Sequence, residues 1–426
     1  MWCYGKNGLS IHRLQMLIAP NATNNPFMSG RSLLLQWDCH YQCLPYLVSR
    51  FRRYGRHKSG VPSGINSTVF GNPATLTQFK GAKFSFGATF YMPEVDLTHD
   101  GSVTGTAFSE NSGTDAFAVP ITAITQDLRG LGIPATLGLG LTAVSGIGAE
   151  FRGNPGSLGA GAEFIILGVN TGLGYEVTDR ISLGFAVTIS FAELDLGLSS
   201  TSAATHDIGL RGTFGATYDT GTTMYGAYYQ TELKHTFDNQ VQTGANSYAS
   251  PDIEQPSNIG FGIANNSLMN GNLLLALDVI HKFWDDAKFW QDIYDDQTVV
   301  SLGAQLTRGS WKYRIGYGYG DDPTDTGTTG PIGGISQVFS NVGPIPLNQQ
   351  VTQYIQATQA EVIYKHRLTL GFGYKGFLAP PIDQDAHVGW QFKEDRDYGT
   401  GSLSGGGHTN AETYSWHTGF ALTWNF

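Results

Sequence analysis

The sequence is poor in charge and in long apolar runs. Asp, Glu, Lys and Arg make up 14% of the 426 residues, whereas about 25% is usual in a soluble domain. One uncharged, largely apolar stretch, residues 130–149, approaches the ~20 residues of a membrane-spanning helix. It contains Pro134 and six glycines and alternates small with large residues, which predicts a strand. These absences exclude a polytopic helical membrane protein.

Glycine and aromatic residues are abundant instead. Glycine contributes 56 residues and the aromatic residues 12%, while the mean hydropathy is −0.15. A disordered chain would lack the aromatic residues. This composition is typical of a membrane β-barrel, whose strands present one face to lipid and a more polar face to the lumen. Residues 61–426 contain no cysteine, which fits export through an oxidising periplasm.

The first sixty residues differ chemically from the rest of the chain. They hold eight of the 25 Lys and Arg residues, one of the 35 acidic residues and all three cysteines. Neither residues 14–20 nor residues 32–48 combine the basic start, unbroken apolar core and cleavage site of a signal peptide. We expect residues 1–59 to be an atypical basic segment that is not native to the exported protein, and its intact mass tests this.

This segment contains two motifs that could bind a ligand, but the rest of the chain supports neither. The basic run at residues 50–58 would suit nucleic acid, but the remaining chain is acidic, so we expect no nucleic-acid partner. Cys39 and Cys43 flank His40, but no second ligand pair follows at the spacing of a zinc site. We therefore expect no metal and no cofactor.

Alternating segments recur from residue 83 to the end of the chain, and we count fourteen. An even number returns both ends of a bacterial barrel to one side of the membrane. The expected fold is all-β, a 14-stranded antiparallel transmembrane β-barrel over residues 83–426. The expected strands are 83–97, 114–127, 136–151, 163–177, 181–195, 208–219, 222–236, 257–266, 273–284, 297–308, 311–320, 350–366, 368–378 and 412–426.

The connections between these segments alternate in length. The short ones are 178–180, 219–221, 308–309 and 365–367. The long ones are 237–256, 285–296, 321–349 and 379–411. Short turns at one rim and long loops at the other are typical of barrels in the bacterial outer membrane. We therefore expect that location, with outer-membrane lipid around the barrel.

Strand parity assigns the side chains to the two faces of the wall. In the last strand Tyr414, Trp416 and Phe420 share the face that we assign to lipid. The opposite parity places charge in the lumen, where we expect structural ion pairs more than substrate contacts. The charged residues expected in the lumen are Asp278, Lys312, Arg314 and Glu361.

The segment before the first strand, residues 60–82, is rich in turn-forming residues and almost uncharged. It is a poor strand and a poor free helix. We expect it to fold into the lumen as a plug, or hatch, held by the lumen charges.

The end of this segment carries the most informative motif, Phe70-Gly71-Asn72-Pro73-Ala74, with residues 76–79 and 88–91 after it. It resembles the junction between hatch and first strand in the FadL-like family of outer-membrane transporters. That family takes up long-chain fatty acids and aromatic hydrocarbons, and it includes toluene-uptake proteins. Further segments look like the family's third, ninth and eleventh strands: residues 141–151, 276–285 and 311–317.

The resemblance covers about residues 60–426 and implies a hatch, a monomer and a lateral route. In the family a hydrophobic substrate is captured outside, enters the lumen and leaves sideways into the membrane through a gap at a kink in the third strand. Glycine inside a strand marks such a bend, so Ser145, Gly146 and Gly148 are our candidates for the gap. The terminal aromatic residue, Phe426, resembles the signal that the barrel-assembly machinery recognises.

The expected function is therefore uptake of hydrophobic small molecules, either long-chain fatty acids or aromatic hydrocarbons. The short connection at residues 196–207 lacks the long helical loop of the fatty-acid transporters, which favours a small or aromatic hydrocarbon. The alternative is a general diffusion porin or a purely structural barrel. We expect no enzyme, because no Gly-x-Ser-x-Gly elbow accompanies the scattered histidines His281, His387, His408 and His417.

Overall fold

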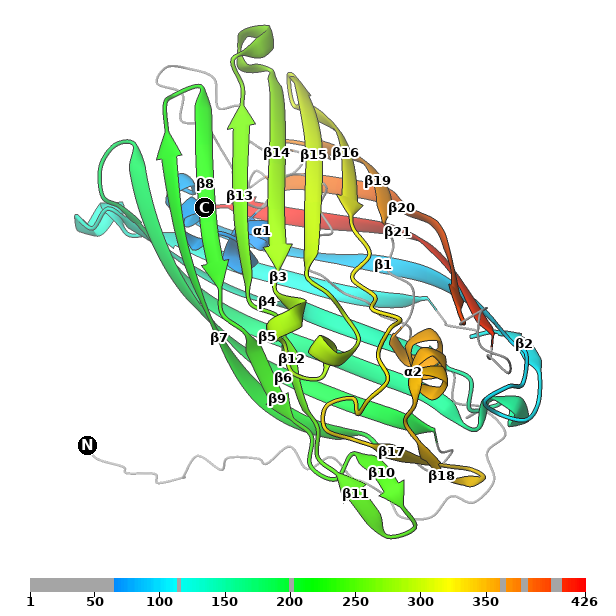
Figure 1. The fold of residues 1–426 in the computed structure, drawn as a ribbon. Helices are drawn as coiled ribbons and strands as arrows, with labels where there is room; N and C mark the ends of the chain where they lie inside the picture. The colour runs from blue at the N-terminus through cyan, green and yellow to red at the C-terminus, as the bar shows by residue number, and fades with distance from the viewer. Residues whose placement is uncertain (1–64, 113–115, 199–202, 361–364, 377–381, 400–407) are drawn as a thin grey trace, which may run out of the picture. The chain divides into compact units, whose positions relative to one another are not determined.

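The computed structural model describes residues 65–112, 116–198, 203–360, 365–376, 382–399 and 408–426. Within them, fourteen strands close into one antiparallel barrel, as the sequence predicts (Figure 1). The strands are β1 (Ala82–His99), β3 (Phe117–Asp127), β4 (Ala135–Glu150), β5 (Ala160–Glu176), β6 (Ile181–Leu198), β7 (Thr205–Asp219), β8 (Thr223–Gln230), β13 (Asn258–Asn265), β14 (Leu273–Lys282), β15 (Gln297–Arg308), β16 (Trp311–Gly320), β19 (His366–Tyr374), β20 (Ile382–Tyr398) and β21 (Thr409–Asn425).

The barrel closes where the first strand meets the last. β1 pairs with β21 on one side, from Lys83↔Asn425 to His99↔Thr409, and with β3 on the other. Every other barrel strand pairs with its neighbours in chain order once the loop strands are set aside. Where its strands are paired, a closed barrel satisfies the backbone N–H and C=O groups inside the membrane.

Smaller elements lie between the barrel strands and before β1. The loop strands are β2 (Phe108–Asn111), β9 (Leu233–Thr236), β10 (Val241–Gly244), β11 (Ser247–Ala249), β12 (Asp252–Gln255), β17 (Gln337–Ser340) and β18 (Gly343–Pro346). The helical elements are α1 (Ile65–Phe70), η1 (Pro73–Gln78), η2 (Arg129–Leu131), η3 (Pro155–Ser157), η4 (Leu268–Gly271), η5 (Trp284–Asp286), η6 (Trp290–Asp292), α2 (Gln349–Ile355) and the π-helical η7 (Gln356–Ala360). None of these helices is long and apolar enough to cross a membrane within the described part of the chain.

Side chains alternate between the two faces of the wall, as predicted. On β21, Tyr414 and Trp416 are 40–45% exposed, whereas Ser415 and His417 between and beyond them are at most 4% exposed. The same alternation runs through β16, where Tyr313 faces outward. The outer face is therefore apolar and aromatic, as a lipid-facing surface must be.

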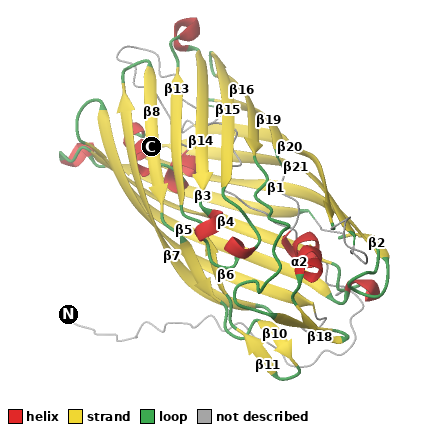
Figure 2. Cartoon of the chain, in the orientation of Figure 1, coloured by secondary structure: helices red, strands yellow, loops and turns green. Residues whose placement is uncertain are grey.

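The two rims differ as expected. Tight turns join β5 to β6 and β7 to β8, while the loops with α2 and the hairpins β10–β11 and β17–β18 gather at the opposite end (Figure 1). Strands make up most of the described chain, and the helical elements are short (Figure 2). By the usual orientation of such barrels, the tight turns face the periplasm and the long loops face outward.

Two expected elements near the carboxy-terminal end were wrong. Of the expected strand 350–366, the described residues 350–360 are helical, in α2 and η7, and β19 begins at His366, so the expected tight turn at 365–367 is also absent. The expected loop 379–411 instead contains β20, which pairs with β19 and β21. The two errors cancel, and the strand number stays at fourteen.

Candidate transport pathway

The motif at residues 70–74 forms the capped start of η1. The Asn72 side-chain Oδ1 accepts a hydrogen bond from the backbone N–H of Ala74 at 3.0 Å, and Pro73 occupies the first position of the helix. Asn is a strong helix N-cap, and Pro at this place lacks only an N–H that would have no partner in the helix. The motif thus fixes a sharp entry into a short helical turn.

Glycines on the inner face of the wall make room for this turn. A Cβ on Gly184 of β6 would lie 2.2 Å from the backbone N of Ala74. A Cβ on Gly215 of β7 would lie 1.9 Å from Asn72 Oδ1. The backbone of the motif therefore lies directly against the backbone of the wall, and Asn72 and Ala74 are fully buried.

Polar contacts join the same turn to the wall. Asn72 Nδ2 donates to the carbonyl oxygens of Ala216 on β7 and Ala227 on β8, at 3.1 Å each. The side chain of Asn170 on β5 donates to the carbonyl of Val69. The buried carboxamides thus have partners, which their desolvation requires.

The end of η1 is tied to the periplasmic rim. Arg129, in the turn between β3 and β4, donates to the carbonyl of Thr77 and pairs with Asp127 at 2.6 Å and Glu176 at 2.7 Å. The Thr77 hydroxyl donates to Ser182 on β6 at 3.0 Å. Residues 65–79 are therefore attached to the wall at both ends.

The third barrel strand, β4, carries an interruption of the sheet. β3 and β4 pair only from Thr122↔Leu141 to Asp127↔Thr136. Beyond Thr122, β3 continues to Phe117 but pairs with β1 alone. β4 continues to Glu150 but pairs with β5 alone. The two strands thus run past each other without a hydrogen-bonded ladder over the outer part of the wall.

A bulge lies at the end of this interruption that is nearer the tight turns. The register between β4 and β5 shifts between Ala143 and Ser145, and such a shift exchanges the faces of the following residues. Gly146 and Gly148 then face Ile165 and Glu163, which share the outward parity of β5. Two consecutive outward positions of β4 therefore lack a side chain.

Buried side chains fill the interruption from within. Tyr91, Val119 and Ala143 form a cluster, and Phe117 and Ile165 pack against it. The Tyr91 ring stacks on Phe117 at 5.6 Å and on His417 at 5.0 Å. The Thr142 hydroxyl donates to the carbonyl of Pro120 at 3.3 Å. Side chains, not a ladder, close this part of the wall.

The predicted lumen charges lie on another part of the wall. Asp278 on β14 and Lys312 on β16 are buried, with 2% and 5% exposure. Arg314 pairs with Asp385 of β20 at 2.7 Å. Glu361 lies outside the described residues. Residues 72–77 instead contact the groups of the wall that are described above.

A small cavity of about 70 Å³ lies inside the barrel beside the bulge. Its lining includes Phe70 of α1, Val144 at the register shift, and two basic side chains, Arg211 of β7 and Lys282 of β14. Arg211 Nη2 donates to the carbonyl of Pro256 at 2.8 Å. The cavity thus brings positive charge next to both the N-terminal segment and the interruption.

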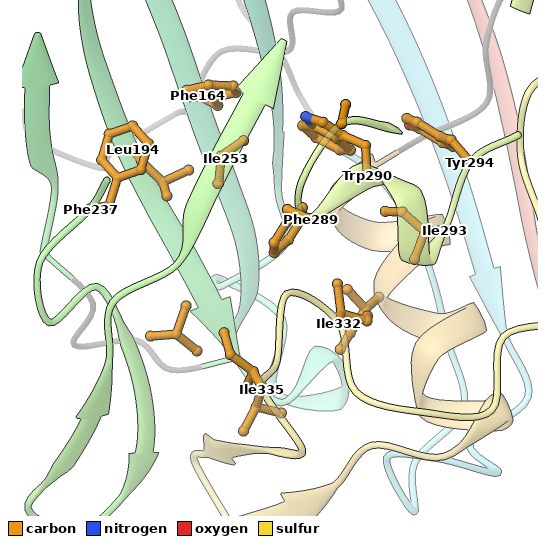
Figure 3. Packing of buried hydrophobic residues seen from close by; sticks show 14 of the residues in the cluster. Phe164, Leu194, Phe237, Ile253, Phe289, Trp290, Ile293, Tyr294, Ile332 and Ile335 are labelled. Carbon is orange, nitrogen blue, oxygen red and sulfur yellow. The ribbon is translucent and has the colours of Figure 1, made fainter. Parts of the chain in front are cut away.

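A large apolar cluster fills the outer end of the lumen (Figure 3). Phe164 and Leu194 from the wall meet Phe237 and Ile253 of the loop between β8 and β13. Trp290, which stacks on Tyr294 at 5.4 Å, joins them from the next loop. This cluster spans the mouth from the wall to the loops.

The segment α2–η7 completes this closure. Tyr354 is fully buried, and its hydroxyl donates to the carbonyl of Ser157 at 2.7 Å. Ala357 packs among the inward residues Val95 of β1, Ala149 of β4 and Ala411 of β21. The sequence predicts a strand here and gives no sign that this segment lies in the mouth of the barrel.

Several residues of the pathway carry no distinct signal in the sequence. Arg129, Asn170 and Arg211 are single polar residues, and Gly184 is one of 56 glycines. Their importance depends on which strands become neighbours. The alternation of inward and outward residues along β5, β6 and β7 is the one sequence signal that places their glycines on the inner face.

Comparison with known proteins identifies the family. The family described as "Outer membrane protein transport protein (OMPP1/FadL/TodX)" matches residues 58–292, more than half of the chain. The chain belongs to this family. It is thus an outer-membrane transport protein, as the resemblance of the motifs predicts. No curated protein sequence matches the chain significantly.

Solved structures of transporters share the fold of this family member. A FadL homologue from Pseudomonas aeruginosa has 15% identity and a TM-score of 0.61. The toluene transporter TodX of P. putida has 18% identity and a TM-score of 0.57, and the toluene transporter TbuX of Ralstonia pickettii 16% and 0.53. Each similarity covers 85% of this chain and 94% of the other. At such identities the likeness concerns the fold.

Proposed function

We propose that this protein takes up hydrophobic compounds and releases them sideways into the outer membrane between β3 and β4. The observation that carries the proposal is the interruption of the β3–β4 ladder above Thr122↔Leu141. An apolar molecule in the lumen gains free energy by passing into lipid instead of water. Gly146 and Gly148 contribute no side chain at two outward positions of β4 beside this passage, and Ser145 follows the register shift.

Residues 60–82 act in this proposal as the hatch, and residues 83–426 as the barrel. The motif from Phe70 to Ala74 is buried against β5–β8, so it blocks a straight path to the periplasm on that side. Residues 1–59 have no role in the proposal, and they lie outside the described residues.

The cavity beside the bulge favours a substrate with a carboxylate. Arg211 and Lys282 both line it, opposite Phe70 and Val144. Charges of opposite sign attract strongly at a buried site, where the effective dielectric constant is about 4–20. A neutral hydrocarbon offers no such attraction. We therefore favour long-chain fatty acids over aromatic hydrocarbons, contrary to what the short loop between β6 and β7 suggests.

Uptake by cells tests the function and the substrate class together. Cells with and without the protein receive labelled oleate or labelled toluene. We expect protein-dependent uptake of oleate, which Arg211→Met lowers about tenfold, the factor that corresponds to 1.4 kcal/mol. Protein-dependent uptake of toluene alone would contradict the carboxylate preference. Faster entry of small hydrophilic solutes alone would make the protein a porin.

A disulfide lock tests the lateral route. The protein with Cys3, Cys39 and Cys43 replaced by Ser receives a cysteine pair at Val119 and Ala143, which pack in one cluster. Oxidation should stop uptake, and reduction should restore it, because the bond closes the interruption.

The matched control for the lock is a pair on the same two strands. Ile124 and Leu139 face each other where β3 and β4 are already paired, and both are outward-facing. Oxidation of this pair should leave uptake unchanged. If the first lock forms and uptake continues, substrate does not leave between β3 and β4.

A further inference from the structure

A groove of about 700 Å³ lies on the outer surface of the barrel, away from the β3–β4 interruption. It crosses four neighbouring strands, β7, β8, β13 and β14. Its lining is almost wholly apolar and includes Ala216, Ala227, Tyr225, Phe261 and Leu277.

The groove exists because two small residues face each other in a wall of large ones. Ala216 of β7 pairs with Ala227 of β8, and both have outward parity. The next outward pair toward the rim, Tyr218↔Tyr225, stacks its rings at 6.5 Å. Most outward positions on barrel strands carry large apolar side chains that meet lipid directly. At Ala216 and Ala227 the surface is recessed to the backbone.

The floor of the groove is held from the other side of the wall. The carbonyl oxygens of Ala216 and Ala227 both accept hydrogen bonds from Asn72 Nδ2. Gly215, next to Ala216, meets Asn72 directly. One layer of backbone thus separates the groove from residues 65–79. These contacts fix the two peptide groups and so keep the recess in one shape.

The groove lies in the periplasmic half of the wall. Ile181, which begins β6, and Tyr218, next to the end of β7, line it beside the tight turns. Tyrosine and tryptophan sit at the level of the lipid head groups. The lipid in this half of a bacterial outer membrane is phospholipid, because lipopolysaccharide occupies the outer leaflet.

We propose that this groove is a lipid-binding site that holds one acyl chain of a phospholipid from the periplasmic leaflet. A flexible chain can follow a narrow apolar recess, and each methylene that leaves the bulk lipid gains close contacts with the fixed walls. The site requires the barrel to lie in the membrane but does not depend on what the protein transports or by which route.

Retention of lipid by the purified protein tests the proposal. The full chain is extracted from membranes in mild detergent, and bound phospholipid is counted by native mass spectrometry. We expect one phospholipid per wild-type barrel. Ala227→Phe fills the recess and should lower its occupancy several-fold, because the new ring takes the space in which the chain makes its close contacts.

The matched control is Ala304→Phe. Ala304 is an outward alanine at a comparable height of β15, where it faces the large residues Leu275 and Ile315 and does not line the groove. This variant should retain the lipid. Equal loss in both variants, or no retained lipid in the wild type, would overturn the proposal. A wild-type dimer that Ala227→Phe dissociates would also overturn it, in favour of a second copy on this face.

Crosslinking adds a measurement that needs no variant. The wild-type protein is reconstituted with a phospholipid that carries a diazirine in one acyl chain and is then irradiated. We expect the modified peptides to map to β7, β8 and β13 around Ala216, Ala227 and Phe261. A uniform distribution over all strands would show ordinary annular lipid and would contradict a site.

Discussion

At the scale of single residues, the inward glycines decide whether residues 72–74 fit against the wall. Gly184→Val should displace them, because the new Cβ would lie 2.2 Å from backbone atoms that have little freedom to move. Overpacking of this kind costs about 1–3 kcal/mol, which corresponds to a rise of about 5- to 150-fold in the exposed fraction of the segment. Labelling of Thr75→Cys by maleimide, in protein without the native cysteines, measures this. Thr75 is fully buried.

Gly318→Val is the control for this substitution. Gly318 also faces inward, on β16, but the nearest heavy atom to a Cβ there is 3.9 Å away. Labelling of Thr75→Cys should stay slow in this background. Fast labelling in both variants would mean that residues 72–74 are loosely held. Slow labelling in both variants would mean that the wall strand moves to accommodate the valine and residues 72–74 stay in place.

A second residue-scale prediction concerns pH. Burial lowers the pKa of His235 in β9 to about 4, with Asp207 opposing this and Arg211 adding to it. An unfolded histidine takes up a proton below about pH 6.5, whereas the folded one stays neutral down to about pH 4. The free energy of opening of this loop should therefore be constant above pH 6.5. It should fall between pH 6.5 and 4, by up to about 3 kcal/mol.

Hydrogen exchange of the β9–β12 hairpin at pH 7.5 and 5.0 measures this loss, after correction for the intrinsic rates. His235→Gln should remove the pH dependence, because glutamine does not titrate in this range. The Ser190 hydroxyl lies 2.9 Å from His235 Nε2, and a glutamine amide keeps a partner for it. If His235→Gln shows the same pH dependence as the wild type, the loss of protection at low pH comes from another titrating group.

At the scale of elements, the segment α2–η7 lies in the mouth, and its Ala357 is fully buried against the wall. Ala357→Glu should expel the segment, since a buried carboxylate without a partner is strongly unfavourable. Added protease should then cleave within residues 349–360 on intact cells. Val342→Glu is the control, because Val342 is 74% exposed in the same loop. Resistance of the Ala357→Glu protein would mean that the rest of the cluster holds α2 in place.

The barrel strands could be predicted from the sequence because lipid imposes a simple alternation. β20 was not predicted, because the outer part of this strand carries Lys393, Glu394 and Asp395. These charged residues interrupt the alternation of apolar and polar residues by which the other strands are recognised. Residues 350–366 show the opposite case. The pattern there predicts a strand that includes Val351, Tyr354 and Ile355. In the structure these residues contact other loops and the inside of the wall. Such contacts are long-range and leave no local signal.

The pathway was predictable only in part for the same reason. The motif around Asn72 stands out because Asn-Pro is a strong local cap signal. Ser145, Gly146 and Gly148 lie beside the interruption and stay candidates for the gap, whereas the register shift lies at Val144, which no residue type marks. Arg129 and Arg211 gain their roles only when distant strands meet.

At the scale of the whole molecule, we predict that assembly depends on the last residue. Phe426 is 73% exposed, and its backbone N–H donates to the carbonyl of Ala82. Its side chain thus contributes little to the folded barrel. If it is the signal for the assembly machinery, Phe426→Ala should lower the amount of folded protein in the membrane several-fold, measured by heat-modifiable mobility in gels. Phe372→Ala, at another exposed aromatic position, should have little effect, and equal losses would contradict the signal.

We propose that the described residues block the lumen at two levels, and this predicts its conductance. Residues 65–79 lie against the wall toward the periplasmic end, whereas α2–η7 and the apolar cluster span the outer mouth. Two barriers in series give a low ion current as long as either remains. Deletion of residues 65–79 or of residues 349–360 should therefore raise conductance in planar bilayers only slightly, and deletion of both should open a porin-like channel. A large current through the first deletion alone would show that the mouth does not seal.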